Sequence, residues 1–155
     1  MKSNHYTHSL YYKLLIGYLI FGLLGFITIA TISSEMTYHH LVVLYDEATM
    51  IADRCSKAYE GKTINLDSAY PQIEAVSAYL QSDIWILNHE GTIVADSSDS
   101  RTGITIDDFD PTAQGNRLYS IGQYYNLFDS KVLSVSAPIT GNMKTYGYIV
   151  IHMPI

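Results

Sequence analysis

The stretch that decides the fold runs from Ser82 to Ser98 and reads "SDIWILNHEGTIVADSS". Its first half contains a continuous apolar run, which is typical of a strand covered on both faces. The letters "NHEG" follow, with turn chemistry and a glycine that can adopt a positive φ. The second half returns with the β-branched and apolar letters "TIVA". The stretch therefore predicts a β-hairpin that belongs to the core of a sheet.

The C-terminal part of the sequence predicts the rest of this sheet. The segment "KVLSVSAPI" at 131–139 alternates with a period of two, and "TYGYIVIHMPI" at 145–155 is apolar enough for a central strand. A further strand is predicted within "RLYSIGQYY" at 117–125, with Gly122 as a bulge. Helical segments precede these strands, so we predict an α+β fold.

The N-terminal part of the sequence predicts a membrane helix. Residues 14–34 form a run of 21 residues without charge, which at 1.5 Å per residue spans about 30 Å, the thickness of the hydrocarbon layer. Lys2 and Lys13 precede this run, and acidic residues begin only at Glu35. The positive-inside rule then predicts cytoplasmic residues 1–13 and an extracytoplasmic domain at 35–155. A cleaved signal peptide is the alternative, although its apolar core would be shorter, about 7–15 residues.

Composition excludes several classes of function. The net charge is −6 and no cluster of Lys and Arg appears, which argues against nucleic acid as a partner. A single cysteine, Cys55, excludes an internal disulfide and a cysteine-based zinc site. The acids at 96–110 do not have the spacing of a calcium loop. Since no catalytic set stands out either, we expect no metal, no cofactor and no enzyme activity in this chain.

A long helix after the membrane segment carries two apolar rows. One row has the heptad spacing of a helix–helix seam and comprises Leu41, Leu44, Ala48, Ile51, Cys55 and Ala58. The second row lies beside it and comprises Tyr38, Val42, Tyr45, Thr49, Ala52, Ser56 and Tyr59. In one interpretation the heptad row pairs with a second copy of the chain while the other row contacts the domain. In the other, both rows form a single wide buried face.

A long polar segment at 96–116 suggests a binding loop, because structureless stretches of this length in compact domains are usually functional. Arg101 and Arg117 lie in or beside it, and Tyr119, Tyr124 and Tyr125 could supply aromatic walls. One hypothesis is a small anionic or amphiphilic ligand bound among these five side chains. The alternative is that both arginines are solvated or paired with nearby acids.

Four segments together resemble a known family. The membrane-continuous helix, the hairpin stretch "SDIWILNHEGTIVADSS" and the closing segments "SVSAPIT" and "YGYIVIHMPI" are similar to the extracytoplasmic PAS-like (Cache-type) sensor domain of bacterial membrane histidine kinases. The resemblance covers residues 14–155, and related sensors occur in chemoreceptors and cyclic-dinucleotide synthases. It implies a roughly five-stranded antiparallel sheet with a long N-terminal helix packed on it and a ligand pocket between the sheet and the long loop.

The resemblance also implies a function. We expect the signal-sensing region of a two-component sensor histidine kinase in the cell membrane, which passes a ligand- or environment-induced change through a dimeric helix. A sensor of a chemoreceptor or cyclic-dinucleotide enzyme, or a stand-alone membrane-anchored interaction domain, is the alternative. In the family a second membrane helix and the kinase follow the last strand, so the resemblance places any kinase activity outside residues 1–155.

Overall fold

The structure is a computed structural model that describes residues 4–58, 66–111 and 119–155. The chain divides into two units, Met1–His40 and Leu41–Ile155. Its elements, in chain order, are α1 (Asn4–Ala58), α2 (Leu66–Leu80), β1 (Asp83–Asn88), β2 (Ile93–Asp96), β3 (Tyr119–Gly122), β4 (Val132–Gly141) and β5 (Lys144–Pro154). The predicted α+β fold, with a long N-terminal helix and five antiparallel strands, is confirmed.

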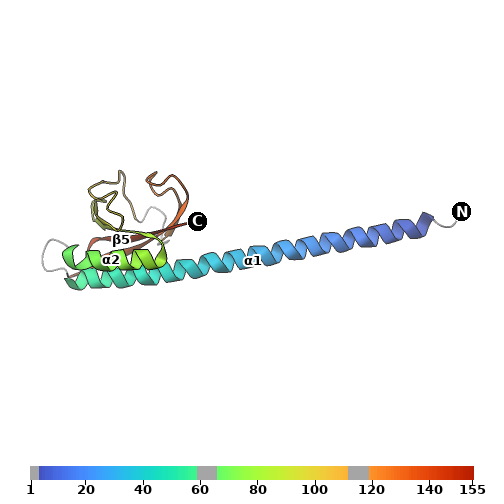
Figure 1. Cartoon of the computed structure of the whole chain (residues 1–155), viewed down its shortest axis with the longest axis horizontal. Coiled ribbons are helices and arrows are strands. Elements are labelled where there is room, and N and C mark those ends of the chain that lie inside the picture. Colours follow the sequence, from blue (N-terminus) through green and yellow to red (C-terminus); the bar gives the residue numbers. More distant parts are fainter. Residues whose placement is uncertain (1–3, 59–65, 112–118) are drawn as a thin grey trace. The chain divides into compact units, whose positions relative to one another are not determined.

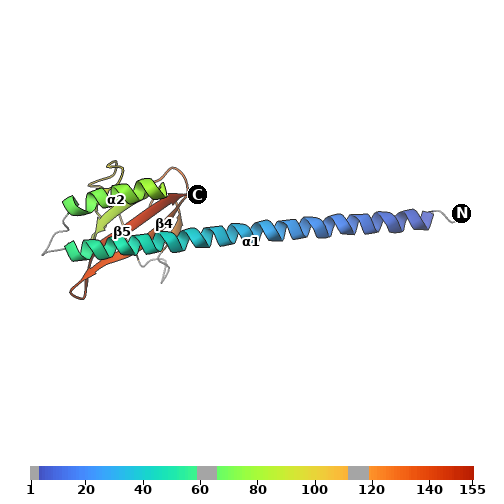
Figure 2. The ribbon, with the colours of Figure 1, turned by 60° about the horizontal axis from the view of Figure 1, so that its bottom comes forward.

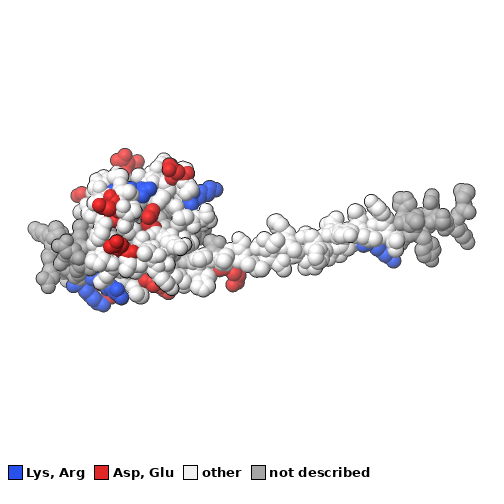
Figure 3. Space-filling view, in the orientation of Figure 1, with Lys and Arg blue, Asp and Glu red and all other residues white. Residues whose placement is uncertain are grey.

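The first unit is the N-terminal part of α1. Large apolar side chains between Leu10 and Ile32 are exposed, and α1 contains a segment long and apolar enough to cross a membrane. The white stretch of this helix in Figure 3 shows the absence of charge between Lys13 and Glu35. The Thr28 hydroxyl donates to the carbonyl of Gly25 at 2.8 Å. Such internal bonds satisfy a hydroxyl where no water is present.

The second unit contains the sheet, whose strand order is β2-β1-β5-β4-β3. The central strand is β5, which pairs with β1 on one side and with β4 on the other. This confirms the prediction of a central strand at the C-terminal end of the sequence. The hairpin predicted at 82–98 is also confirmed, since β1 and β2 pair antiparallel with Trp85 opposite Asp96.

Helices cover one face of this sheet. The C-terminal part of α1 and α2 lie side by side across it (Figures 1 and 2). Alternate residues of the strands point toward them, so that Ile84 and Ile86 of β1 and Ile149 and Ile151 of β5 enter one aliphatic core. We call this the helix-covered face.

The helix-covered face corrects the prediction of a dimer seam. Leu44, Ala48, Ile51 and Cys55 are at most 4% exposed and belong to the core of their own domain. Leu41 packs partly buried against the same core, and the side chain of Ala58 lies outside the described part of the structure. Tyr45 and Ala52 of the second row also contact this core. Helical spacing had left two interpretations open: the structure buries the heptad row in its own domain, whereas Tyr38, Val42 and Thr49 of the second row are exposed.

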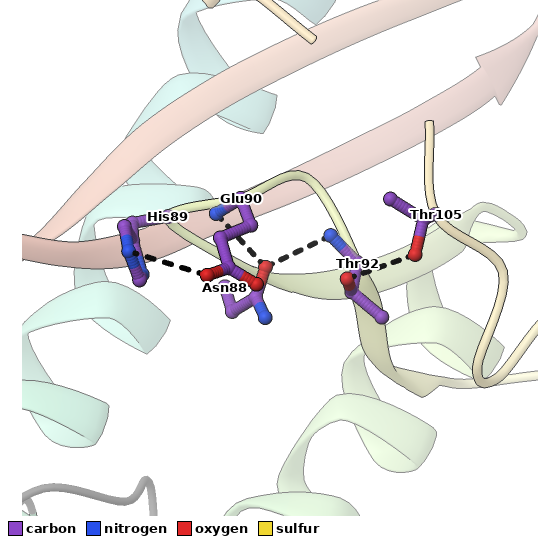
Figure 4. A network of polar contacts seen from close by, with 5 residues as sticks. All are labelled: Asn88, His89, Glu90, Thr92 and Thr105. Carbon is purple, nitrogen blue, oxygen red and sulfur yellow. Dashed lines mark hydrogen bonds and ion pairs between the residues drawn. The ribbon is translucent and has the colours of Figure 1, made fainter. Parts of the chain in front are cut away.

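The turn between β1 and β2 holds the long loop in place (Figure 4). The Asn88 Oδ1 atom accepts hydrogen bonds from the backbone N–H groups of Glu90 (3.0 Å) and Thr92 (2.8 Å). The hydroxyl of Thr92 then bonds that of Thr105 at 3.0 Å. Gly91 has a φ of 85°, and a Cβ there would lie 2.5 Å from the Cβ of Phe109. The turn thus requires glycine both for its backbone conformation and for the close approach of the loop.

Candidate functional site

The second face of the sheet is covered by loops and has a different chemistry. Trp85 and Leu87 of β1 and Val150 of β5 belong to its apolar cluster, to which Tyr148 adds partly buried surface. His152 follows on the same face, because side chains of one strand alternate between faces with a period of two. The covering comes from residues 97–111 and 123–130, which contribute Ile106, Phe109, Tyr124, Leu127 and Phe128. We call this the loop-covered face.

Four rings form an aromatic cluster on this face: Trp85, Tyr124, Phe128 and His152. The Trp85 and Phe128 rings stack with centroids 5.3 Å apart and planes 9° apart. The His152 ring lies 4.1 Å from Trp85 and 4.5 Å from Tyr124, centroid to centroid. Trp85 and His152 are almost fully buried. The cluster therefore joins two neighbouring strands to the covering segment 123–130.

Tyr124 reaches the cluster through a strained stretch of backbone. Tyr124, Tyr125 and Asn126 have positive φ values of 34°, 53° and 58°. This conformation costs a non-glycine residue about 1–2 kcal/mol, and it persists where surrounding contacts over-determine it. Burial raises the pKa of Tyr124, an effect that a hydrogen bond with Ser136 opposes. The strained turn thus places the phenol of Tyr124 in the interior of the domain.

Arg101 links the two covering segments. Its Nη2 atom donates to the carbonyl of Leu127 at 3.2 Å, and its Nη1 atom donates to Ser100 Oγ at 3.1 Å. The guanidinium carbon lies 4.7 Å from the centroid of the Phe128 ring and 5.5 Å from that of Trp85. These contacts make Arg101 a clamp on the aromatic cluster.

Asp96 at the end of β2 fixes the loop that carries Arg101. It is fully buried. Its carboxylate accepts hydrogen bonds from the backbone N–H groups of Ser98 (3.0 Å) and Arg101 (2.9 Å) and from the hydroxyls of Ser98 and Ser100. Hydrogen bonds to an ionised acceptor are among the stronger ones in proteins. Asp96 is therefore the residue that positions the Arg101 loop.

His152 is the most unusual buried group on the loop-covered face. Its Nδ1 atom lies 2.7 Å from Ser134 Oγ, across the β4–β5 pair. Burial, assisted by the nearby Arg101, holds the pKa of His152 well below its usual value, so the ring is neutral. Within the described residues, His152 Nε2, Trp85 Nε1 and Ser82 Oγ are buried without a hydrogen-bond partner. Such atoms in a native structure call for an explanation, for example a ligand or water.

A cavity of about 270 Å³ lies beside the aromatic cluster, where β1 begins and β5 ends. Two of the three unpartnered atoms belong to residues of its wall, Ser82 and His152. Burial raises the pKa of Asp83 in the same wall, and the charge of Asp96 raises it further, while Arg101 lowers it. The complete wall is formed by Ser77, Gln81, Ser82, Asp83, Phe128, Ser130, Val132, His152 and Pro154.

The structure brings only part of the predicted site together. Arg101 and Tyr124 both contact the aromatic cluster. Tyr125 is 41% exposed and exchanges hydrogen bonds with the backbone of Asp110. Tyr119 packs against the helix-covered core instead. Arg117 lies outside the described residues.

Sequence reasoning missed the residues that line the cavity. Two signals in the sequence could have found some of them. His152 is the lone polar residue within the apolar strand "YIVIHM", and Trp85 occupies the matching face of the predicted hairpin. Ser82 and Asp83 gave no signal, because serine and aspartate at the start of a strand are ordinary turn residues.

Solved structures share the fold of this chain. The sensor domain of the V. cholerae histidine kinase DctB matches with a TM-score of 0.50 and 16% identity, over 77% of this chain and 52% of that one. The ligand-binding domain of the Campylobacter jejuni chemoreceptor Tlp3, in complex with L-valine, matches with a TM-score of 0.56 and 12% identity, over 79% and 54%. The chain has the PAS/Cache-like fold of these two domains.

The same sensor fold is found with a second ligand in Tlp3, since its complex with L-norvaline matches with a TM-score of 0.54 and 14% identity, over 83% of this chain and 54% of that one. The chain spans about half the length of these structures. No protein-family model and no curated protein matches the sequence. At these identities the likeness establishes the sensor fold, and function has to be argued from the site.

Proposed function

We propose that this chain is the extracytoplasmic sensing region of a membrane receptor and that it detects a small molecule at the loop-covered face. The observation that carries this proposal is the cavity beside the aromatic cluster, with Ser82 and His152 in its wall and their side-chain atoms unpartnered. Each such atom costs about 1–3 kcal/mol when it is buried unpaired, so a ligand that bonds it would stabilise the domain. The sensor and ligand-binding domains that share the fold support the same function.

We further propose that the receptor is a two-component sensor histidine kinase. A chemoreceptor fits the fold equally well, since both classes occur among the similar structures. A cyclic-dinucleotide enzyme or a stand-alone anchored interaction domain remains an alternative. In each receptor version this chain supplies the sensing, and any kinase activity belongs to another part of the receptor.

The proposed topology places residues 1–13 in the cytoplasm, 14–34 in the membrane and 35–155 outside. Its test uses cysteines introduced into a Cys55→Ala background and a maleimide that does not cross membranes. Met143→Cys, at a fully exposed hairpin tip, should be labelled in intact cells. Ser3→Cys should be labelled only after permeabilisation. The reverse pattern would overturn the topology.

Signal transmission is proposed to run through paired copies of α1. Because the heptad row is buried in its own domain, we place the pairing on the exposed side of the helix, where Tyr38, Val42 and Met50 are between 40% and 69% exposed. A ligand would bias two packings of this pair by binding one more tightly. Sedimentation of the full chain in detergent micelles tests this, and an unchanged dimer in Val42→Asp would exclude this side.

The predicted anionic ligand stays a hypothesis. Of its two arginines only Arg101 lies in the described residues, and its guanidinium already bonds Ser100 and Leu127. A bound anion would have to share or replace these bonds.

The proposed function is tested in a chimeric receptor that joins residues 1–155 to the second membrane helix and kinase of a known histidine kinase. Kinase output should change when a defined panel of amino acids, organic acids and amines is added. Ser82→Leu, which fills the cavity, should abolish the response. Thr140→Leu is a matched control, because Thr140 is exposed on β4 away from the cavity. Constant output from a membrane-inserted, active chimera across the panel would contradict the proposal.

A further inference from the structure

The charge of the cavity wall is the first clue to its ligand. Among the lining residues, Asp83 carries the only full charge at neutral pH, because the buried His152 is neutral. The Asp83 carboxylate makes no hydrogen bond or ion pair within the described part of the chain. Arg101 lies near enough to affect Asp83, but its N–H groups bond Ser100 and Leu127. The nearby Asp96 carboxylate acts on Asp83 in the opposite sense to Arg101.

Hydrogen-bonding capacity is the second clue. When His152 Nδ1 donates to Ser134 Oγ at 2.7 Å, its unpartnered Nε2 is a bare acceptor. The Ser82 hydroxyl, also unpartnered, can accept as well. Neither of these two atoms is exposed to a water-sized probe, so a small movement of the wall has to open them to a ligand. Together with the half-buried Asp83 carboxylate they then give three acceptors in one wall. An ammonium group offers three N–H donors and a positive charge, which matches this set.

The remaining wall suits a short alkyl chain. Phe128, Val132 and Pro154 provide apolar surface. The cavity of about 270 Å³ corresponds to roughly nine waters at the volume that each occupies in the liquid. An amine of four or five carbons therefore fits with room for hydration. A carboxylate of the same size would place its charge beside Asp83 without a cation in the wall.

We infer that the cavity between the start of β1 and the end of β5 binds a small primary alkylammonium ion, held by Asp83, His152 and Ser82. The inference rests on the proposed function in that it names the ligand class of the same site. Binding and signalling are nevertheless separable, so that each can fail without the other.

The test is a titration of the full chain in detergent micelles with three probes of equal size: butylammonium chloride, sodium butyrate and butyramide. Trp85 is the only tryptophan of the sequence and its ring lies 4.1 Å from that of His152, so its emission reports on the cavity. Calorimetry gives the affinity independently. Butylammonium should bind saturably, at least about tenfold more tightly than either other probe at matched ionic strength. Equal or tighter binding of butyrate or butyramide would overturn the inference.

Asp83→Asn keeps the shape of the wall and removes its charge, and it should weaken butylammonium binding at least about tenfold. Asp107→Asn is the matched control, because Asp107 is an exposed loop acid beside the opposite end of β1. Its affinity should equal that of the wild type. Ser82→Ala should weaken binding about threefold through the loss of one acceptor. Unchanged affinity in Asp83→Asn, in a chain that still unfolds cooperatively, would overturn the inference.

The chimeric receptor separates this inference from the proposed function. Butylammonium binding without any change in kinase output would confirm the cation site and contradict its sensing role. A kinase response to other compounds without butylammonium binding would confirm sensing and contradict the cation site.

Discussion

The two faces of the sheet are built from the same strands but have opposite chemistries. The helix-covered face packs aliphatic residues such as Leu44, Ile86 and Ile151 against α1 and α2. The loop-covered face contains a buried histidine, a clamped arginine and a run of left-handed backbone. Successive side chains of a strand point to opposite faces of the sheet, so the residues on one face can differ in chemistry from those on the other.

This difference separates the residues that stabilise the fold from those that serve its function. The three buried, unpartnered side-chain atoms found among the described residues belong to Ser82, Trp85 and His152. Trp85 and His152 point to the loop-covered face, and Ser82 lines the cavity at its end. Unpaired buried groups are retained where selection favours something other than stability. Substitutions should accordingly have their largest effect on stability at the helix-covered face, and should change the pH response and ligand binding at the loop-covered face.

The largest effect is expected on the helix-covered face. Leu44→Asp buries an unpaired carboxylate against the sheet and should lower the free energy of unfolding by more than about 4 kcal/mol. Tyr79→Asp, on the exposed side of α2, should change it by less than about 1 kcal/mol. Urea unfolding of the full chain in micelles, followed by circular dichroism, measures both. Similar losses in the two variants would contradict the assignment of the buried row.

The next effect is a pH dependence that originates on the loop-covered face. The pKa of His152 is well below 6.5 in the folded chain, whereas the unfolded chain takes up a proton near pH 6.5. The unfolded state therefore gains stability as the pH falls below about 6.5, and the free energy of unfolding should drop by up to about 1.4 kcal/mol per pH unit.

The variants that check this slope differ in burial. His152→Phe should flatten the pH dependence between pH 7.5 and 5, whatever it does to the stability at pH 7.5. His89→Gln, at an exposed turn position, should leave the slope as it is in the wild type. A slope that survives in His152→Phe would assign the effect to another group.

A smaller effect is expected from the arginine clamp. Arg101→Ala removes the hydrogen bond to Leu127 and the contact with the Phe128 ring, and should cost about 1–2 kcal/mol. Lys144→Ala, at an exposed position of β5, should be neutral. Arg101→Ala, together with Arg117→Ala, also tests the predicted anion site by calorimetry. If any anionic ligand found for the wild type keeps its affinity in both variants, that site is excluded.

The smallest effect should come from Asp83 and should have the opposite sign. Burial raises its pKa, so its ionised form destabilises the folded state at neutral pH. Asp83→Asn should therefore raise the free energy of unfolding, by less than about 1 kcal/mol because the half-buried group is partly screened by solvent. The gain should vanish as the pH falls through the raised pKa of Asp83. A loss of stability would show that the carboxylate has a partner in the fold.

The sequence was most informative where local chemistry and periodicity agreed. The apolar run before "NHEG" predicted the hairpin, and the apolar C-terminal segment predicted the central strand. The spacing of the heptad row predicted that its residues are buried. It could not predict whether they pack on a sheet or on a second helix, because both require the same spacing. Leu44 and Ile51 therefore appeared as a seam when they are core.

The site was less predictable because it depends on register and on turns. His152 meets Ser134, 18 residues away, only through the pairing of β4 with β5. Tyr119 and Tyr124 lie five residues apart, yet one packs on the helix-covered core and the other in the aromatic cluster. The residues with positive φ that follow β3 are Tyr124, Tyr125 and Asn126. None of them is glycine or proline, so their residue types did not predict this turn. Residue type alone could not place these side chains.

Hydrogen exchange of the full chain in micelles tests the central claim most directly, that the loop-covered face opens to a ligand while the helix-covered face is the stable core. The amides of Arg101, Ile106 and Phe128 belong to the covering segments and donate to the Asp96 carboxylate, the Gly91 carbonyl and the Gln123 carbonyl, respectively. The amides of Ile86 and Ile151 lie in the paired strands. The account predicts that the first group exchanges through local opening, at a free energy well below that of global unfolding, and that the second exchanges only on global unfolding. Equal protection of both groups would contradict it.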